Sequence, residues 1–125
     1  MKRSLIIYLL VLLGACSKDP GEAKDNDAPL LTLNTPTNNQ TYTGGQNIMI
    51  SGQVTDNKYI KEIHVVITNL GSGIEYLHVH IHPNASSFTY NQSYTAQAGI
   101  FYKIEVIADD WSLNSSAKSV QVFCN

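Results

Sequence analysis

The sequence predicts an all-β domain, an antiparallel β-sandwich of about seven strands. From residue 30 on, short runs rich in β-branched and aromatic residues alternate with turn signals, and the runs recur at roughly ten-residue spacing. Apolar residues occupy every second position in most runs, which is the period of a half-buried strand, and no run has a convincing helical period. The predicted strands cover residues 30–34, 46–55, 60–69, 75–82, 86–95, 101–108 and 117–123, and residues 35–45 are predicted to be a loop.

The first fifteen residues are predicted to be an export signal. Lys2 and Arg3 precede an apolar run over residues 5–13, which is shorter than the about 20 residues that a membrane-spanning helix needs. Leu-Gly-Ala-Cys at residues 13–16 resembles the lipobox of bacterial lipoproteins. That resemblance implies cleavage before Cys16, lipid attachment to its thiol, and a membrane anchor on the outer membrane, at the cell surface or in the periplasm.

The remaining chain is expected to form one domain on a tether. Residues 16–29 are polar and charged, a composition typical of a flexible linker, and residues 30–125 are predicted to form the sandwich. Six lysines and ten carboxylates follow residue 15, and no basic patch is present, so nucleic acid is not expected as a partner. Cys16 and Cys124 are the two cysteines, so no disulfide is expected within the domain.

Residues 60–82 are predicted to form a hairpin whose outer face carries all four histidines. A turn centred on Ser72 pairs His64 with His80 and Val66 with His78. The same register pairs Ile67 with Leu77, Val65 with Val79 and Ile63 with Ile81 on the inner face. A shift by one residue would bury histidines, which fixes the register. The residues predicted to share the outer face are Glu62, His64, Val66, Tyr76, His78, His80 and His82.

The histidines are candidate ligands for a transition metal. His64, His78 and His80 are expected to form a triangle that could hold Zn, Cu or Ni, with His82 and Glu62 as a further cluster. The alternative is an ordinary solvated sheet face, or a face covered by a partner. A catalytic zinc needs an open coordination position inside a shaped pocket, and a flat sheet face offers none, so the protein is not expected to be an enzyme.

A second candidate site lies among acidic loop residues expected at one end of the sandwich. Asp27, Asp56, Asp109 and Asp110 could gather oxygen atoms around Ca²⁺. The segment from Asp25 to Pro29, Asp-Asn-Asp-Ala-Pro, resembles a cadherin linker. The alternative is that these residues only stabilise turns by hydrogen bonding to their own backbone.

Two segments resemble the immunoglobulin-like modules of bacterial surface lipoproteins. One runs from Pro29 through Pro36 and Gly44-Gly45 to Asp56, and the other covers residues 99–109. The resemblance implies an Ig-like sandwich in which the hydroxyl of Tyr102 ties down a corner. Relatives usually carry Asp-x-x-Gly-Asn before the last strand, and here Leu113 stands in place of the glycine. With its lipobox, the chain resembles Bacteroidetes lipoproteins of unknown function built on one such domain.

The leading functional interpretation is a lipid-anchored, non-catalytic binding or adhesion module. Trp111 and Tyr59 are candidate contacts for a partner, which would be another envelope protein or a glycan. The alternative for Trp111 is that it caps the end of the sandwich. The competing function is transition-metal binding by the histidines, for sequestration or delivery. Metal uptake by the folded domain would separate the two functions.

Overall fold

Alternating apolar and polar residues form seven strands within residues 21–125, the part of the chain that this computed structural model describes. The strands are β1 (Leu30–Leu31), β2 (Gln40–Tyr42), β3 (Asn47–Asn69), β4 (Glu75–Ile81), β5 (Ala85–Thr95), β6 (Phe101–Asp110) and β7 (Ser115–Cys124). The predicted export signal and Cys16 lie outside the described residues. No helix that could cross a membrane is found in residues 21–125.

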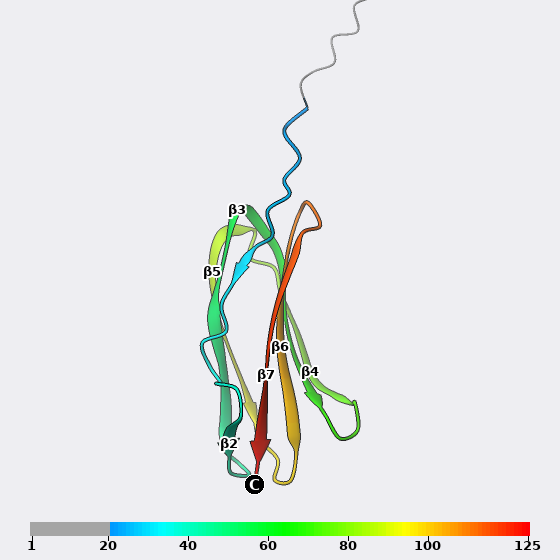
Figure 1. Cartoon of the computed structure of the whole chain (residues 1–125). Helices are drawn as coiled ribbons and strands as arrows, with labels where there is room; N and C mark the ends of the chain where they lie inside the picture. Colours follow the sequence, from blue (N-terminus) through cyan, green and yellow to red (C-terminus); the bar gives the residue numbers. More distant parts are fainter. Residues whose placement is uncertain (1–20) are drawn as a thin grey trace, which may run out of the picture.

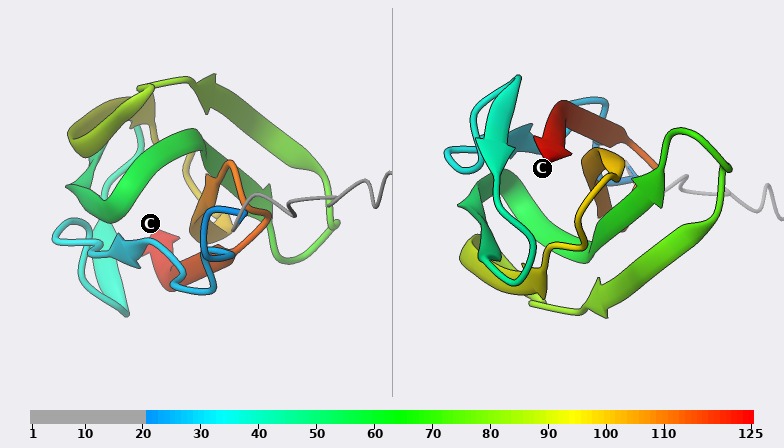
Figure 2. Two further views of the ribbon diagram at one scale, coloured as in Figure 1. Left: turned by 90° about the horizontal axis from the view of Figure 1, so that it is seen from above. Right: turned by 90° about the horizontal axis from the view of Figure 1, so that it is seen from below.

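The strands predicted over residues 46–55 and 60–69 form one long strand, β3, that takes part in both layers of the sandwich. Its first half pairs with β1 and β5, and its second half pairs with β4 and β6. The register is interrupted between Thr55 and Ile60 beside β5, and between Ile60 and Glu62 beside β6. Such irregularities let a strand bend from one layer into the other. Figures 1 and 2 show this bend and the two layers that it joins.

The second layer has the strand order β4-β3-β6-β7-β2, and its last member corrects the predicted loop. β2 lies within residues 35–45 and pairs with β7 in parallel, with Tyr42 opposite Cys124. A strand of three residues with a single buried side chain, Tyr42, is too short for alternation to reveal. The prediction of a loop was therefore wrong at residues 40–42.

The core lies between the two layers and is built from the inward side chains of every strand. The fully buried large residues are Ile48, Ile50, Val54, Ile60, Ile63, Val65, Ile67, Tyr90, Tyr102, Ile104, Val106 and Val122. Burial of one such side chain contributes about 1.5–3 kcal/mol. Tyr102 also fixes a corner, because its hydroxyl accepts a hydrogen bond from the Gln97 backbone N–H at 2.9 Å.

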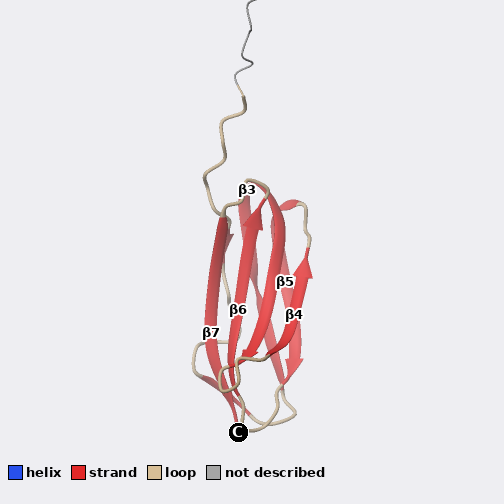
Figure 3. Ribbon diagram, turned by 90° about the vertical axis from the view of Figure 1, so that its right-hand side faces the viewer, coloured by secondary structure: helices blue, strands red, loops and turns tan. Residues whose placement is uncertain are grey.

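All strands run along one long axis, and residues 21–29 enter at the end opposite the C-terminus (Figures 1 and 3). The bend of β3 and the turn between β6 and β7 lie at this same end, called here the tether end. Contacts hold the entering segment there: Asn114 donates to the backbone carbonyls of Asp25 and Asp27, and Ser116 donates to that of Pro29. The segment predicted as tether therefore contacts the sandwich from Asp25 onward.

The buried Tyr90 side chain leaves room only for glycine at position 52, in the layer formed by β1, β5 and the first half of β3. The Tyr90 hydroxyl donates to the Thr32 carbonyl at 2.6 Å, and burial raises the pKa of Tyr90 to about 12. A Cβ at Gly52 would overlap both Thr32 and Tyr90.

We expect Gly52→Ala to lower the free energy of unfolding by about 1–3 kcal/mol or more, because the added methyl group would push the neighbouring strands apart. Tyr90→Phe should cost about 1–3 kcal/mol, because the Thr32 carbonyl loses its partner. Urea unfolding followed by circular dichroism measures both changes. Gly21→Ala, where a Cβ meets no atom of the described chain within 4 Å, is the control and should leave stability within about 0.5 kcal/mol. Equal stability of Gly52→Ala and this control would contradict the packing.

Candidate functional site

The outer face of the β3–β4 hairpin carries the histidines in the predicted register. His64 lies opposite His80, and Val66 lies opposite His78. Ile63, Val65 and Ile67 of β3 are fully buried, so the alternation of the strand turns His64 outward. The predicted pairing is confirmed from Ile63 to Ile67, after which a bulge shifts the register.

Three imidazoles converge on this face, and we call His64, His78 and His80 the histidine cluster. Each offers a ring nitrogen within 4.8 Å of those of the other two. His64 Nδ1 lies 3.1 Å from His78 Nε2, and the His80 ring stacks on the His78 ring with centroids 4.4 Å apart. Two nitrogens bound to one tetrahedral zinc at 2.0–2.1 Å lie about 3.3 Å apart. The His64–His78 pair therefore has nearly the spacing that a shared metal ion requires, and His80 offers a ring nitrogen within 4.8 Å of both.

In each ring of the histidine cluster, one nitrogen lies close to a carboxylate. His80 Nδ1 lies 2.5 Å from Glu62 Oε1, and His78 Nδ1 lies 3.2 Å from Glu75 Oε2. Metal-binding histidines commonly donate their second N–H to a carboxylate, which orients the ring and selects its tautomer. In both rings Nε2 is then the nitrogen without a carboxylate contact.

His64 has the opposite arrangement. Its Nε2 lies 3.4 Å from Glu62 Oε2 and 3.5 Å from Asp109 Oδ2, so Nδ1 is the nitrogen without a carboxylate contact. This is the nitrogen that faces His78. Sequence reasoning did not identify Glu75 and Asp109 as partners of the histidines. Asp109 could have been found from the pairing of β3 with β6, which places it opposite Glu62.

Glu62 is the electrostatic centre of this face. Its hydrogen bond with His80, together with the charges of His64, His80 and His82 when they are protonated, lowers the pKa of the Glu62 carboxyl. His82 Nε2 lies 3.7 Å from Glu62 Oε1, but His82 is not one of the three converging histidines, and it is the most exposed of the four. Glu62, His64 and Asp109 form a second converging group that shares His64 with the cluster.

At the tether end, Asp25, Asp56 and Asp110 bring carboxylate oxygens within 4.8 Å of one another, and we call these three residues the acidic cluster. The predicted calcium set named Asp27 and Asp109 instead of Asp25. β6 continues to Asp110, and consecutive residues of a strand point to opposite faces, so Asp109 joins the histidines while Asp110 is buried. Asp27 contributes its backbone N–H to Asp25 Oδ1 at 3.1 Å, and its side chain lies outside the converging group.

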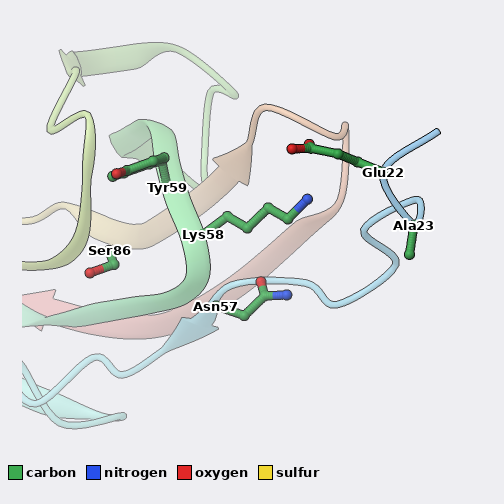
Figure 4. Close-up of a pocket in the computed structure, with 6 residues that line it drawn as sticks. All are labelled: Glu22, Ala23, Asn57, Lys58, Tyr59 and Ser86. Carbon is green, nitrogen blue, oxygen red and sulfur yellow. The ribbon is translucent and has the colours of Figure 1, made fainter. Parts of the chain in front are cut away.

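The residues predicted for partner binding lie at the same end of the sandwich. Tyr59 lines an open depression with Glu22, Ala23, Asn57, Lys58 and Ser86 (Figure 4). Trp111 does not line this depression; its side chain is 62% exposed, and the Lys61 ammonium lies 5.5 Å from the ring centroid. The Trp111 ring therefore stands out from the end of the sandwich and does not close over it.

One further side chain lies elsewhere than expected. Tyr76, predicted on the outer face beside the histidines, packs against the core with its ring stacked parallel to Tyr94 at 6.4 Å between centroids. The bulge opposite Ile67 and Thr68 accounts for the difference, because it adds a residue to β4 and turns Tyr76 inward.

The lowered pKa of Glu62 makes the stability of the domain depend on pH. The unfolded chain binds a proton at Glu62 more readily than the folded chain does, so this stabilisation is present above about pH 4.5, the ordinary value, and is lost as pH falls through the lower folded pKa. We expect Glu62→Gln to reduce the free energy of unfolding more at pH 6 than at pH 3, measured by urea unfolding. Glu22→Gln, at an exposed position, should show no such difference. A Glu62→Gln effect that is the same at both pH values would contradict this role.

Comparisons with known proteins place the fold and the family. The fibronectin(III)-like modules of Clostridium thermocellum CbhA resemble this chain with a TM-score of 0.56 at 21% sequence identity. The match covers 78% of this chain and 47% of that one, so this chain spans about half the length of that structure. The likeness confirms the predicted Ig-like β-sandwich. No curated protein matches the sequence. Residues 14–109, more than half of the chain, match a family model, and the protein therefore belongs to the family described as Domain of unknown function (DUF4625).

Proposed function

We propose that this domain is a transition-metal-binding module that holds one ion of the zinc, copper or nickel class at His64, His78 and His80. The observation that carries the proposal is the division of roles at each ring: one nitrogen contacts a carboxylate, and the second nitrogens of His64 and His78 face each other at 3.1 Å, where one ion could replace the proton between them. Neutral imidazole nitrogen is a favoured ligand of these metals. Of the two functions expected from the sequence, metal binding is the one that this geometry supports best.

The surroundings of the histidine cluster favour a cation. Glu62, Glu75 and Asp109 each lie within 3.5 Å of a ring nitrogen, so negative charge surrounds the ligands. The side chains of His78 and His80 are 39% and 47% exposed, which leaves the ion open to solvent. A three-histidine site on an exposed sheet face has room for a further ligand, such as water or a donor from another protein. This arrangement suits sequestration or transfer of the ion, and we propose no reaction.

Zinc titration of the full chain, purified in detergent and without a histidine tag, tests the proposal. Isothermal calorimetry at pH 7.5 should show one Zn²⁺ per chain with a Kd of about 1 μM or tighter. His80→Ala should weaken binding at least tenfold, because the ion loses one of its three nitrogen ligands.

His82→Ala is the matched control, since His82 lies on the same face and contacts Glu62 but stands outside the cluster. It should change the Kd less than threefold. Equal weakening in the two variants would mean that zinc binds to scattered surface histidines. Binding no tighter than about 1 mM in the unmutated chain would rule the function out.

The proposal places this site on an exported protein anchored to the outer membrane by a lipid on Cys16. It rests on the resemblance of residues 13–16 to a lipobox. In a Gram-negative host, the chain should be recovered in the membrane fraction and should incorporate labelled palmitate. Cys16→Ser should abolish the label and release the chain from membranes, whereas Cys124→Ser should change neither. Labelling that persists in Cys16→Ser would contradict the anchor.

The binding or adhesion function remains a prediction for the tether end of the domain. Its support is the exposure of Trp111 and Tyr59, whose side chains stand out within reach of a protein or glycan. A partner at this end and a metal on the outer face of the hairpin are compatible, because no residue of the histidine cluster lines the depression.

A further inference from the structure

Three carboxylates from distant parts of the chain meet where the entering segment reaches the sandwich. Asp25 belongs to that segment, Asp56 lies where β3 bends, and Asp110 ends β6. Each offers an oxygen within 4.8 Å of the other two. Like charges at such distances repel each other, so the folded chain brings together groups that would separate unless something offsets their charge.

The second observation is that two oxygens of these three carboxylates are buried and have no partner within residues 21–125. Asp25 is 7% exposed, and its Oδ2 accepts no hydrogen bond from any residue of the described chain. Asp56 Oδ1 is likewise buried without a partner among residues 21–125. Burial of an ionised oxygen is costly unless the oxygen is paired or coordinates a metal.

Turn stabilisation accounts for the other oxygens of the acidic cluster. Asp110 Oδ1 accepts the backbone N–H groups of Ser112 and Asn114, and its Oδ2 accepts the Asn114 side chain at 2.7 Å. Asp56 Oδ2 accepts the Lys58 backbone N–H at 2.8 Å. These bonds fix the orientation of the carboxylates. They do not account for the burial of Asp25 Oδ2 and Asp56 Oδ1 without a partner in the described part of the chain.

The hydrogen bonds to Asp25 favour its charged form. The Asn57 side chain donates to Asp25 Oδ1 at 2.9 Å, and this bond, with the Asp27 backbone N–H and the nearby Lys58 charge, lowers the pKa of Asp25. Lys58 is exposed, and no ion pair joins it to the acidic cluster within the described part of the chain.

We propose that Asp25, Asp56 and Asp110 bind one Ca²⁺, with Asp25 Oδ2 and Asp56 Oδ1 as direct ligands. Calcium takes oxygen ligands at 2.3–2.6 Å, so two ligands on opposite sides of the ion lie about 4.8 Å apart. The observed spacing fits within that limit. Calcium binds six to eight oxygens in flexible geometry, and water completes a shell that protein carboxylates begin. The set contains no nitrogen or sulfur, which separates it from the histidine cluster.

Calcium at this position ties the entering segment to the end of the sandwich. Asp25 is the only one of the three ligands that lies before β1, so the ion joins that segment to β3 and β6. Asn114 already holds the backbone of residues 25 and 27 in place. Bound calcium therefore makes the approach to the domain rigid and sets its direction relative to whatever precedes residue 21.

Calcium binding to the full chain, purified in detergent and stripped of divalent ions, tests the proposal by two readouts. Addition of 1 mM Ca²⁺ should raise the Tm by at least about 5 °C, because the ion binds the folded chain alone. Trypsin cleavage after Lys24, next to Asp25, should slow at least fivefold. Asp25→Asn, which keeps the shape of the side chain, should abolish both effects.

Asp27→Asn is the matched control, two residues away and outside the converging group, and it should keep both calcium effects. His80→Ala should also keep them, which separates this site from the proposed zinc site. Loss of both effects in Asp27→Asn would mean that calcium acts through general charge, and would overturn the proposal. No response of the unmutated chain to Ca²⁺, together with a Tm that rises as pH falls from 7 to 5, would show that a shared proton offsets the charges instead.

Discussion

The alternation of side chains along β3 is the constraint on which both clusters depend. Ile63, Val65 and Ile67 are fully buried, and each contributes about 1.5–3 kcal/mol through that burial. A shift of one residue would expose all three and bury His64, which the fold cannot tolerate. The same strand pairs with β4 on one side and β6 on the other, so the core also fixes where His78, His80 and Asp109 lie. Hydrophobic packing thus brings the histidines together.

Carboxylates determine what this preorganised cluster can do. Three imidazoles in contact could simply hydrogen bond to one another, as His64 and His78 do at 3.1 Å. Glu62 and Glu75 in addition offer acceptors to the Nδ1 atoms of His80 and His78, so in these two rings Nε2 is the nitrogen without a carboxylate contact. A solvated sheet face needs no such division of roles. This division supports the proposal that the histidines are metal ligands, because carboxylate partners orient the rings of such ligands and select their tautomers.

Features that follow from the alternation of side chains along a strand could be predicted from the sequence. The predictions failed where that alternation is interrupted. The fold class and the hairpin register followed from alternation, and the structure confirms both. Tyr76 was misplaced because a bulge adds a residue, and β2 was missed because it is short and pairs in parallel with β7. Asp25 was missed as a cluster member because nothing in a polar segment indicates which carboxylate will dock. Leu113 has a φ of 69°, in the left-handed region that favours glycine, so this turn adopts that backbone conformation with a residue other than glycine.

Adjacent residues of β6 connect the two clusters, one as a contact of the histidine cluster and the other as a member of the acidic cluster. Asp109 contacts His64, and Asp110 belongs to the acidic cluster, while β3 pairs with both positions through Glu62 and Ile60. Neighbouring side chains of a strand point to opposite faces, so the two proposed ion sites lie on either side of the peptide unit that joins Asp109 and Asp110. If both ions bind, each restricts the same strand end, and any effect of calcium on zinc affinity must equal the effect of zinc on calcium affinity. The interruption of the register between Ile60 and Glu62 lies at this point, so this irregular backbone is the segment through which such coupling would pass.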